Sequence, residues 1–260
     1  MNFRDLCGAA ITCTLLAVTT AAAAATAATA GSSAVDCDAG SVSGTRLGTS
    51  RTLVMARTGA AYGHVQHAAL PLAPGEVVLT FDDGPQPAST PQVLQALAQQ
   101  CARATFFMTG EALSRAPELG AQVRAEGHTV GAHGFGHPHF AALPEAEQLA
   151  DLKAAQDVHQ RIFGGAFAAY RFPFLEETMP LKNALKAQGI TVMSIDVSVD
   201  DWLPDQTPQM LTDRLLERLQ ESGGGIILLH DAQAQTAAAL PMMLRALKDK
   251  GYRVVHLQWP

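Results

Sequence analysis

The chain has 260 residues, of which 48% are hydrophobic and 16% are charged, and its formal net charge is −6 at pH 7. This composition is sufficient to bury one sizeable core and excludes a disordered chain. The negative balance gives no reason to expect a nucleic-acid partner or an anionic membrane surface.

Residues 1–30 have the pattern of a secretory signal peptide. Arg4 lies near the start, an apolar stretch runs from about residue 6 to residue 18, and an alanine- and threonine-rich run ends at Ala28-Thr29-Ala30. This order is typical of a signal with a small-residue cleavage site. An uncleaved membrane anchor is the alternative, because the combined run approaches spanning length. Alanine and threonine insert weakly, so we expect cleavage, export to the periplasm or medium, and no stable membrane span afterwards.

Cleavage would leave two of the four cysteines, Cys37 and Cys101. An oxidising compartment permits a disulfide between them. However, residues 31–50 are rich in Gly, Ser, Ala and Thr, a composition typical of a flexible linker, and they include Cys37. Cys101 comes at the end of an expected helix. These positions argue against the pairing.

Residues 51–75 contain short apolar pieces and end at Pro74-Gly75. We expect this lead-in segment to pack on the main domain. His64 and His67 have a spacing suited to ligands but lie outside any regular element, which favours surface positions.

Strand-like and helix-like runs alternate over residues 76–260. The expected strands are 77–81, 104–108, 128–132, 168–172, 190–196, 225–229 and 252–257. The expected helices are 91–100, 117–126, 144–162, 179–188, 208–221 and 236–250. Thr90-Pro91 and Thr207-Pro208 have the pattern of an N-cap followed by proline in the first turn. Seven strands with intervening helices predict a single parallel α/β domain, either a barrel or an open sheet.

Aspartate, histidine and arginine residues, which can act as acids, bases or metal ligands, follow the expected strands. They are Asp82 and Asp83, His133 and His137, Arg171, the acids between Asp196 and Asp201, and His230 and Asp231. The C-terminal ends of parallel strands share one face, where active sites lie in barrels. The sequence therefore predicts one site built from five distant segments.

The first of these segments suggests two different roles for adjacent acids. Asp82 and Asp83 follow a continuous apolar run and precede Gly84-Pro85, a turn signal. Neighbouring side chains of an extended chain point to opposite sides, so one acid can face a metal and the other a reacting water. A solvent-exposed Asp-Asp-Gly turn is the alternative for this motif alone.

His133 and His137 are four residues apart in a glycine-rich turn. Together with Asp83 they form a set of two imidazoles and one carboxylate, which leaves positions open on zinc or a similar divalent ion. A structural or surface pair is the alternative for the two histidines alone. His139 is a competing ligand, but Pro138 redirects the chain before it.

Five motifs occur in the order seen in one enzyme family. They are Thr80-Phe81-Asp82-Asp83-Gly84-Pro85, His133-x-x-x-His137-Pro138, Arg171-Phe172-Pro173-Phe174, Asp201-Trp202 and Ile227-Leu228-Leu229-His230-Asp231. Over about residues 76–258 the chain resembles the polysaccharide deacetylases (carbohydrate esterase family 4, which includes the nodulation-type chitooligosaccharide deacetylases). The resemblance implies a distorted parallel (β/α) barrel, one divalent metal ion that is usually zinc, and hydrolysis of N-acetyl groups on amino sugars.

The resemblance also implies roles for the first three motifs. Asp83, His133 and His137 would bind the metal. Asp82 would be the general base, which must stay ionised within hydrogen-bond reach of the attacking water. Arg171 would pair with Asp82, lower its pKa and fix its orientation.

The remaining roles concern the acid and the substrate. His230 would protonate the leaving amine, and Asp201 would raise the pKa of His230 by favouring the charged ring. The oxyanion would contact a backbone N–H near Phe174. Trp202 and Leu228 would line an apolar slot for the acetyl methyl group, although both are also compatible with simple core or strand positions.

The second motif departs from the family pattern. Its first histidine is normally followed by Ser or Thr, whose hydroxyl helps to fix the loop, and here Gly134 follows. Ala132 stands where Asn is frequent, and Gly136 adds further freedom. Loss of such supporting hydrogen bonds costs about 10–100-fold in metal affinity or activity.

Two further positions need a choice. Phe174 stands where Tyr is frequent, which keeps the backbone donor and removes a hydroxyl. Asp196 and Asp200 compete with Asp201 for the fourth motif, and Asp201 is preferred because Trp202 follows it.

The sequence therefore predicts an exported, metal-dependent N-deacetylase whose partner is a chitooligosaccharide, peptidoglycan or exopolysaccharide. The alternatives are a glycan-binding relic without turnover and a cyclic-amide hydrolase, because relatives on this scaffold hydrolyse such amides. Retention of Asp82 and His230 argues against the relic, since binding alone needs neither acid nor base. An export signal argues against cyclic amides, which are usually cytoplasmic.

Overall fold

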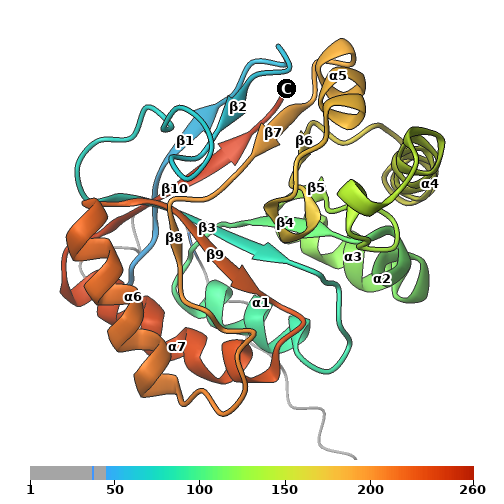
Figure 1. The fold of residues 1–260 in the computed structure, drawn as a ribbon. Helices are drawn as coiled ribbons and strands as arrows, with labels where there is room; N and C mark the ends of the chain where they lie inside the picture. Colours follow the sequence, from blue (N-terminus) through green and yellow to red (C-terminus); the bar gives the residue numbers. More distant parts are fainter. Residues whose placement is uncertain (1–36, 38–44) are drawn as a thin grey trace, which may run out of the picture. The chain divides into compact units, whose positions relative to one another are not determined.

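The computed structural model describes Cys37 and residues 45–260 (Figure 1). The expected signal peptide and most of the expected linker lie outside these residues. Within the described part of the chain, no helix combines the length and the apolar character needed to cross a bilayer.

Strand β3 (Glu76–Asp82) is the centre of the sheet. All seven of its residues are buried, as its continuous apolar run predicts. It pairs with β10, β4 and β9. The other strands are β1 (Thr49–Val54), β2 (Ala61–Tyr62), β4 (Thr105–Met108), β5 (Thr129–Ala132), β6 (Ala169–Tyr170), β7 (Thr191–Met193), β8 (Val197–Ser198), β9 (Gly225–His230) and β10 (Arg253–Gln258).

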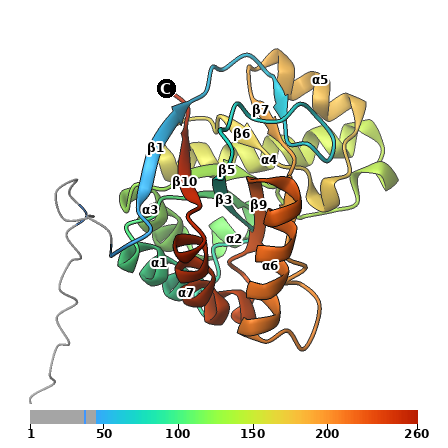
Figure 2. The same ribbon diagram turned by 90° about the vertical axis from the view of Figure 1, so that its left-hand side faces the viewer.

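The strand order is β1-β10-β3-β4-β5-β6-β7-β2, with β9 on β3 and β8 on β9. Every one of these pairings is parallel. Figure 2 shows β1 and β10 side by side, with helices on the outside of the sheet. The predicted parallel α/β class is therefore confirmed, with ten strands in the described residues instead of about seven.

Helices connect the strands and cover the sheet. They are α1 (Thr90–Gln99), α2 (Gly110–Arg115), α3 (Pro117–Ala125), α4 (Glu145–Phe163), α5 (Met179–Ala187), α6 (Pro208–Ser222) and α7 (Ala234–Asp249), with 3-10 turns η1 (Phe140–Ala142) and η2 (Pro173–Leu175). Helix α7 packs against both α1 and α6. The short helix α2 was not expected; its N-cap is Thr109, whose hydroxyl accepts from Ala112 N–H at 3.2 Å.

The lead-in segment contributes strands at both ends of the sheet. β1 pairs with β10, and β2 pairs with β7. β1 begins at Thr49, within the stretch expected to be a linker, and its residues alternate between partly buried and exposed. This alternation is the pattern of a strand with one covered face.

The two expected threonine caps differ. Thr207 caps α6, and its hydroxyl accepts from Met210 N–H at 3.2 Å. Thr90 is not a cap: α1 begins at Thr90 itself, and the hydroxyl of Thr90 donates to the carboxylate of Asp231. The hydrogen bond that the Thr90 hydroxyl donates to a carboxylate is stronger than the one it would accept from a helix N–H. The contact with Asp231 therefore prevails over helix capping.

Cys37 and Cys101 form a disulfide with a Cα–Cα distance of 5.4 Å. The expectation that their positions disfavour pairing was wrong. Cys101 follows α1 with φ 53°, so the chain turns sharply there. The N–H groups of Leu47 and Gly48 donate to Gln100 at the end of the same helix, so this part of the chain lies beside the residue that precedes Cys101.

Candidate active site

The predicted residues lie at one end of the sheet, where its parallel strands end. Asp82 is the last residue of β3 and lies directly opposite His230, the last residue of β9. His133 follows β5 and Arg171 follows β6, two neighbouring strands (Figure 1). The segments expected to meet at the C-terminal ends of the strands do meet there.

Asp83, His133 and His137 form a compact group of ligand atoms. Asp83 Oδ1 lies 3.4 Å from His137 Nε2 and 3.6 Å from His133 Nε2. One ligand atom from each residue lies within 4.8 Å of the other two, and no other such group of acids, histidines or cysteines occurs among the described residues. Asp83 Oδ1 is buried and accepts no hydrogen bond. An orphaned carboxylate oxygen between two imidazole nitrogens fits a divalent cation.

The tautomer of His133 suits a metal ligand. Its Nδ1 lies 2.8 Å from the carbonyl oxygen of Arg171, so the Nδ1–H donates to that oxygen and the Nε2 lone pair points to Asp83. Burial lowers the pKa of His133 to about 3, which keeps the ring neutral. A neutral imidazole is the form that binds a metal.

His139, the competing ligand, points elsewhere. Its Nδ1 lies 3.0 Å from Glu176 Oε1, and its ring stacks on Phe174.

Arg171 holds the Asp82 carboxylate in place. Its side chain is fully buried, and its guanidinium lies over the Phe107 ring at 4.3 Å. Nη1 donates to Asp82 Oδ1 at 2.8 Å. The other acceptors of the guanidinium are Thr80 Oγ1, Met193 O and Ser194 O. Four acceptors hold the guanidinium in one orientation and thereby fix the Asp82 carboxylate.

The pKa of Asp82 is raised, whereas pairing with Arg171 was expected to lower it. Burial raises it, while the charge of Arg171 acts in the opposite direction. The sequence identified the cation beside Asp82 but not the near-complete desolvation of the carboxyl, which is 2% exposed.

His230 is held as an imidazolium by Asp201. His230 Nδ1 lies 2.7 Å from Asp201 Oδ1, and Asp201 Oδ2 accepts from His230 N–H at 2.8 Å and from Thr236 Oγ1 at 2.5 Å. Desolvation lowers the pKa of His230, but the hydrogen bond and charge of Asp201, with the charges of Asp82 and Asp83, raise it to about 9. This is the direction that the resemblance implied.

The two competing acids have other partners. Asp200 binds Arg218 at 2.6 Å. Asp196 accepts backbone N–H groups from His64 and Ile226. Asp201 is therefore the carboxylate at His230.

Apolar side chains flank the polar centre. The Trp202 ring is 46% exposed and lies 5.5 Å from the His230 ring. Leu228 is buried on β9, two residues before His230 and hence on the same face. Phe174, 51% exposed with φ 56°, lies 4.5 Å from the His137 ring.

Asp231 joins the first and last motifs. Its buried carboxylate accepts from Gly84 N–H at 3.2 Å and from the Thr90 hydroxyl, and its backbone carbonyl accepts from Ser89 Oγ at 2.5 Å. Any Cβ at Gly84 would overlap this carboxylate. Burial raises the pKa of Asp231 to about 7. The sequence placed Asp231 at a strand end without revealing this contact.

None of the sequence motifs pointed to Asp151. It lies on α4 and accepts two backbone N–H groups of the loop between His133 and His137. No motif includes it, because its partners are main-chain groups.

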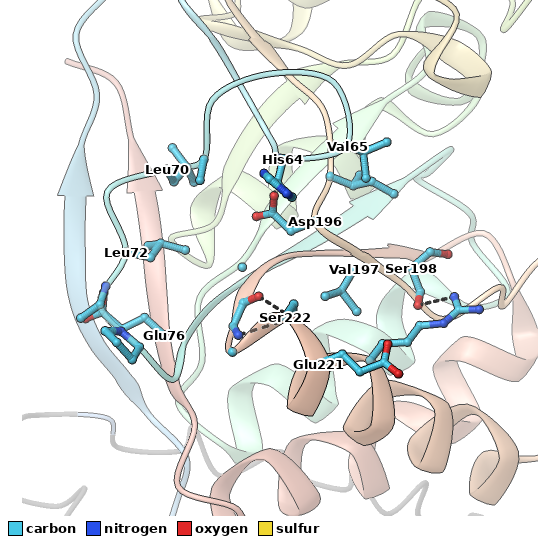
Figure 3. A pocket seen from close by; sticks show the side chains of 18 residues that line it. His64, Val65, Leu70, Leu72, Glu76, Asp196, Val197, Ser198, Glu221 and Ser222 are labelled. Atoms are coloured by element: carbon cyan, nitrogen blue, oxygen red, sulfur yellow. Dashed lines mark hydrogen bonds between the residues drawn. The ribbon is translucent and has the colours of Figure 1, made fainter.

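A separate cavity of about 900 Å³ is lined by Asp196, but by no residue of the ligand group and by neither Asp82 nor His230 (Figure 3). It is bounded by the lead-in segment, by residues 195–198, and by the junction of α6 with β9. His64 lines this cavity close to Asp196, and His67 instead binds Glu177. The two histidines of the lead-in segment therefore take no part in the ligand group.

Comparisons with known proteins agree with this geometry. The family model described as polysaccharide deacetylase matches residues 70–193. The chain is 33% identical over 179 residues to peptidoglycan-N-acetylmuramic acid deacetylase PdaC of Bacillus subtilis, a match covering 69% of this chain and 37% of that protein. It is 30% identical over 191 residues to chitooligosaccharide deacetylase of Azorhizobium caulinodans, covering 68% and 90%.

Among solved structures, the peptidoglycan deacetylase Bd3279 of Bdellovibrio bacteriovorus superposes with a TM-score of 0.74 at 31% identity, covering 83% of this chain and 60% of that one. The chain thus spans well under two thirds of the Bacillus relative and nearly all of the Azorhizobium relative. It belongs to the polysaccharide deacetylase family, as its five motifs indicated.

Proposed function

We propose that the protein is a metal-dependent hydrolase that removes N-acetyl groups from glycans containing N-acetylglucosamine. The observation that carries this proposal is the group formed by Asp83, His133 and His137, with Asp82 and His230 beside it on adjacent strands. The names of the relatives, which are deacetylases of peptidoglycan and chitooligosaccharide, support the substrate class.

Asp83, His133 and His137 would hold one divalent ion, and zinc is our proposal because it favours two imidazoles and a carboxylate with an open position. When bound, the ion supplies Lewis-acid chemistry at the acetyl carbonyl. The orphaned oxygen of Asp83 and the neutral state of His133 support this assignment.

Asp82 acts as the general base. Arg171 occupies its Oδ1, while Oδ2 lies 3.7 Å from His133 Nε2, on the side of the ligand group. Oδ2 therefore takes the proton of the attacking water as the water oxygen bonds to the acetyl carbon.

His230 acts as the general acid. Its Nδ1–H is committed to Asp201, so Nε2–H is the proton available to the substrate. With a pKa of about 9, the ring carries that proton at neutral pH. Transfer to the amide nitrogen lets the C–N bond break, giving acetate and a free amine.

The backbone N–H at Phe174 is proposed to donate to the developing oxyanion, and Trp202 with Leu228 to accommodate the acetyl methyl group. Phe174 has a positive φ of 56°, and its ring lies 4.5 Å from the His137 ring, which supports a place for this residue beside the ligand group. An acetyl methyl is small and apolar, so a slot between an indole and a leucine suits it.

We also propose that the protein is exported. The disulfide between Cys37 and Cys101 supports an oxidising compartment. Peptidoglycan and other cell-surface glycans are accessible there.

Acetate release tests the proposal. Purified metal-free protein is incubated with chitooligosaccharide or with peptidoglycan, with and without added Zn²⁺. We expect zinc-dependent acetate release that Asp82→Asn and His230→Ala each reduce by at least about 100-fold. Binding of the glycan without acetate release by the wild-type protein would instead indicate a glycan-binding relic.

A further inference from the structure

The loop from His133 to His137 must place two ligand nitrogens precisely, yet its own sequence gives little constraint. Both nitrogens lie within 3.6 Å of Asp83 Oδ1. Gly134, with φ 73°, and Gly136 stand between the two histidines. Glycine has large conformational freedom, so the constraint has to come from outside the loop.

Asp151, in the second turn of α4, contacts the middle of this loop. Its Oδ1 accepts from Phe135 N–H at 2.7 Å, and its Oδ2 accepts from Gly136 N–H at 3.0 Å. Hydrogen bonds to a carboxylate are stronger than those between neutral groups. Because each oxygen takes one of two successive N–H groups, the carboxylate fixes both the position and the direction of the chain leading into His137.

Helix α2 holds the same loop from the other side. Gly110 N–H donates to Gly134 O at 2.9 Å, and Glu111 N–H donates to Phe135 O at 3.0 Å. These are first-turn N–H groups, which have no partner within their own helix. The loop thus lies between the two helices, with its carbonyl groups bonded to α2 and its N–H groups bonded to Asp151.

We propose that Asp151 is a positioning residue of the metal site, which keeps His137 in place relative to His133 by ordering the chain between them. This inference rests on the proposed function. Asp151 supplies the support that a hydroxyl after the first histidine would otherwise give. A Cβ at Gly134 would lie 3.2 Å from Asp151 Oδ1, so a serine there would crowd the carboxylate and would also meet a positive φ.

Zinc affinity of the metal-free protein tests this role, measured with Zn²⁺ alone against a competing chelator. The variants are Asp151→Ala and Asp151→Asn, and the matched control is Asp157→Asn. Asp157 lies on the same helix but is exposed and pairs with Lys153, away from the loop. We expect about 10–100-fold weaker zinc binding for Asp151→Ala, a smaller loss for Asp151→Asn, and a change below about two-fold for the control.

Hydrogen exchange at the amides of Phe135 and Gly136 in metal-free protein gives a second readout, independent of zinc and of activity. Faster exchange in Asp151→Asn, with the melting temperature close to that of the control, supports positioning. Wild-type zinc affinity in Asp151→Ala, or unchanged exchange in Asp151→Asn, overturns it. If Asp151→Ala does not fold, zinc affinity and exchange of Asp151→Asn decide.

These results separate the two proposals. A wild-type protein that binds zinc through its three ligands but releases no acetate refutes the proposed function and leaves the role of Asp151 standing. Zinc-dependent acetate release, together with a zinc affinity that does not change in the Asp151 variants, supports the proposed function and refutes the role of Asp151.

Discussion

The charge of Asp201 determines the protonation of His230, and Asp201→Asn removes that charge with little change of shape. The carboxylate is fully buried, with Oδ1 2.7 Å from His230 Nδ1. Desolvation acts against the imidazolium, but Asp201 outweighs it and is the largest contribution that raises the pKa of His230 to about 9. Without this charge we expect the pKa of His230 to fall to its ordinary value of 6.5 or lower.

The effect on protonation is large at mildly alkaline pH. At about pH 8 a group with a pKa near 9 is ~90% protonated and one with a pKa near 6.5 is ~3% protonated, roughly a 30-fold loss of imidazolium. The folded-state pKa is raised, so the stabilisation is complete below about pH 6.5 and is lost as the pH rises through about 9. The stability difference between wild type and Asp201→Asn should therefore shrink across that interval.

NMR titration of His230 in metal-free protein measures this pKa directly, and the pH dependence of kcat/KM follows it in the active enzyme. Asp200→Asn is the matched control, because Asp200 is the adjacent acid but binds Arg218. The control should titrate like the wild type. The reasoning is refuted if His230 titrates near 6.5 in the wild type, or remains near 9 in Asp201→Asn.

Three further predictions concern stability. Arg171→Met leaves Asp82 buried without its cation, so urea denaturation should show a loss of about 3 kcal/mol, and a loss below about 1 kcal/mol would contradict the buried ion pair. Zn²⁺ at about 100 times its dissociation constant should stabilise the metal-free protein by about 2.7 kcal/mol in thermal unfolding but leave His133→Ala unchanged; equal stabilisation of the variant would mean that zinc binds elsewhere. Cys101→Ala opens a disulfide-closed loop with a sequence separation of 64 and should lower the unfolding free energy by about 4 kcal/mol, whereas unchanged stability would argue against the bond.

The sequence predicted well those features that depend on a continuous run of similar residues. β3 reads as a buried parallel strand because five apolar or β-branched residues follow one another, and Asp82 and Asp83 at its exit identify the end of the sheet that carries the site. The ends of parallel strands coincide in space, so motifs far apart in the chain could be assigned to one place before any distance was known.

Contacts between distant parts of the chain were not predictable in this way. β1 pairs with β10 over about 200 residues, and Thr-Ser-Arg-Thr-Leu-Val has too weak an alternation to mark a strand. The bond from Cys37 to Cys101 joins residues with a sequence separation of 64, and the hydrogen bonds of Leu47 and Gly48 to Gln100 lie near it. Neither relation leaves a local signal in the sequence.

Side-chain contacts to backbone groups, and burial, were the other gaps. Asp151 acts on the N–H groups of Phe135 and Gly136, which every residue type except proline presents. The pKa of Asp82 was expected to fall beside Arg171, but burial reverses the direction, and the degree of burial depends on the packing of the whole sheet.

We expect one divalent ion to be bound by Asp83, His133 and His137, between Asp82 and His230. Anomalous diffraction at the zinc edge, from crystals grown with Zn²⁺, tests it most directly. We predict one strong peak about 2.0–2.2 Å from Asp83 Oδ1 and from Nε2 of both histidines. Crystals with zinc bound at other residues, and no peak at this position, would contradict it.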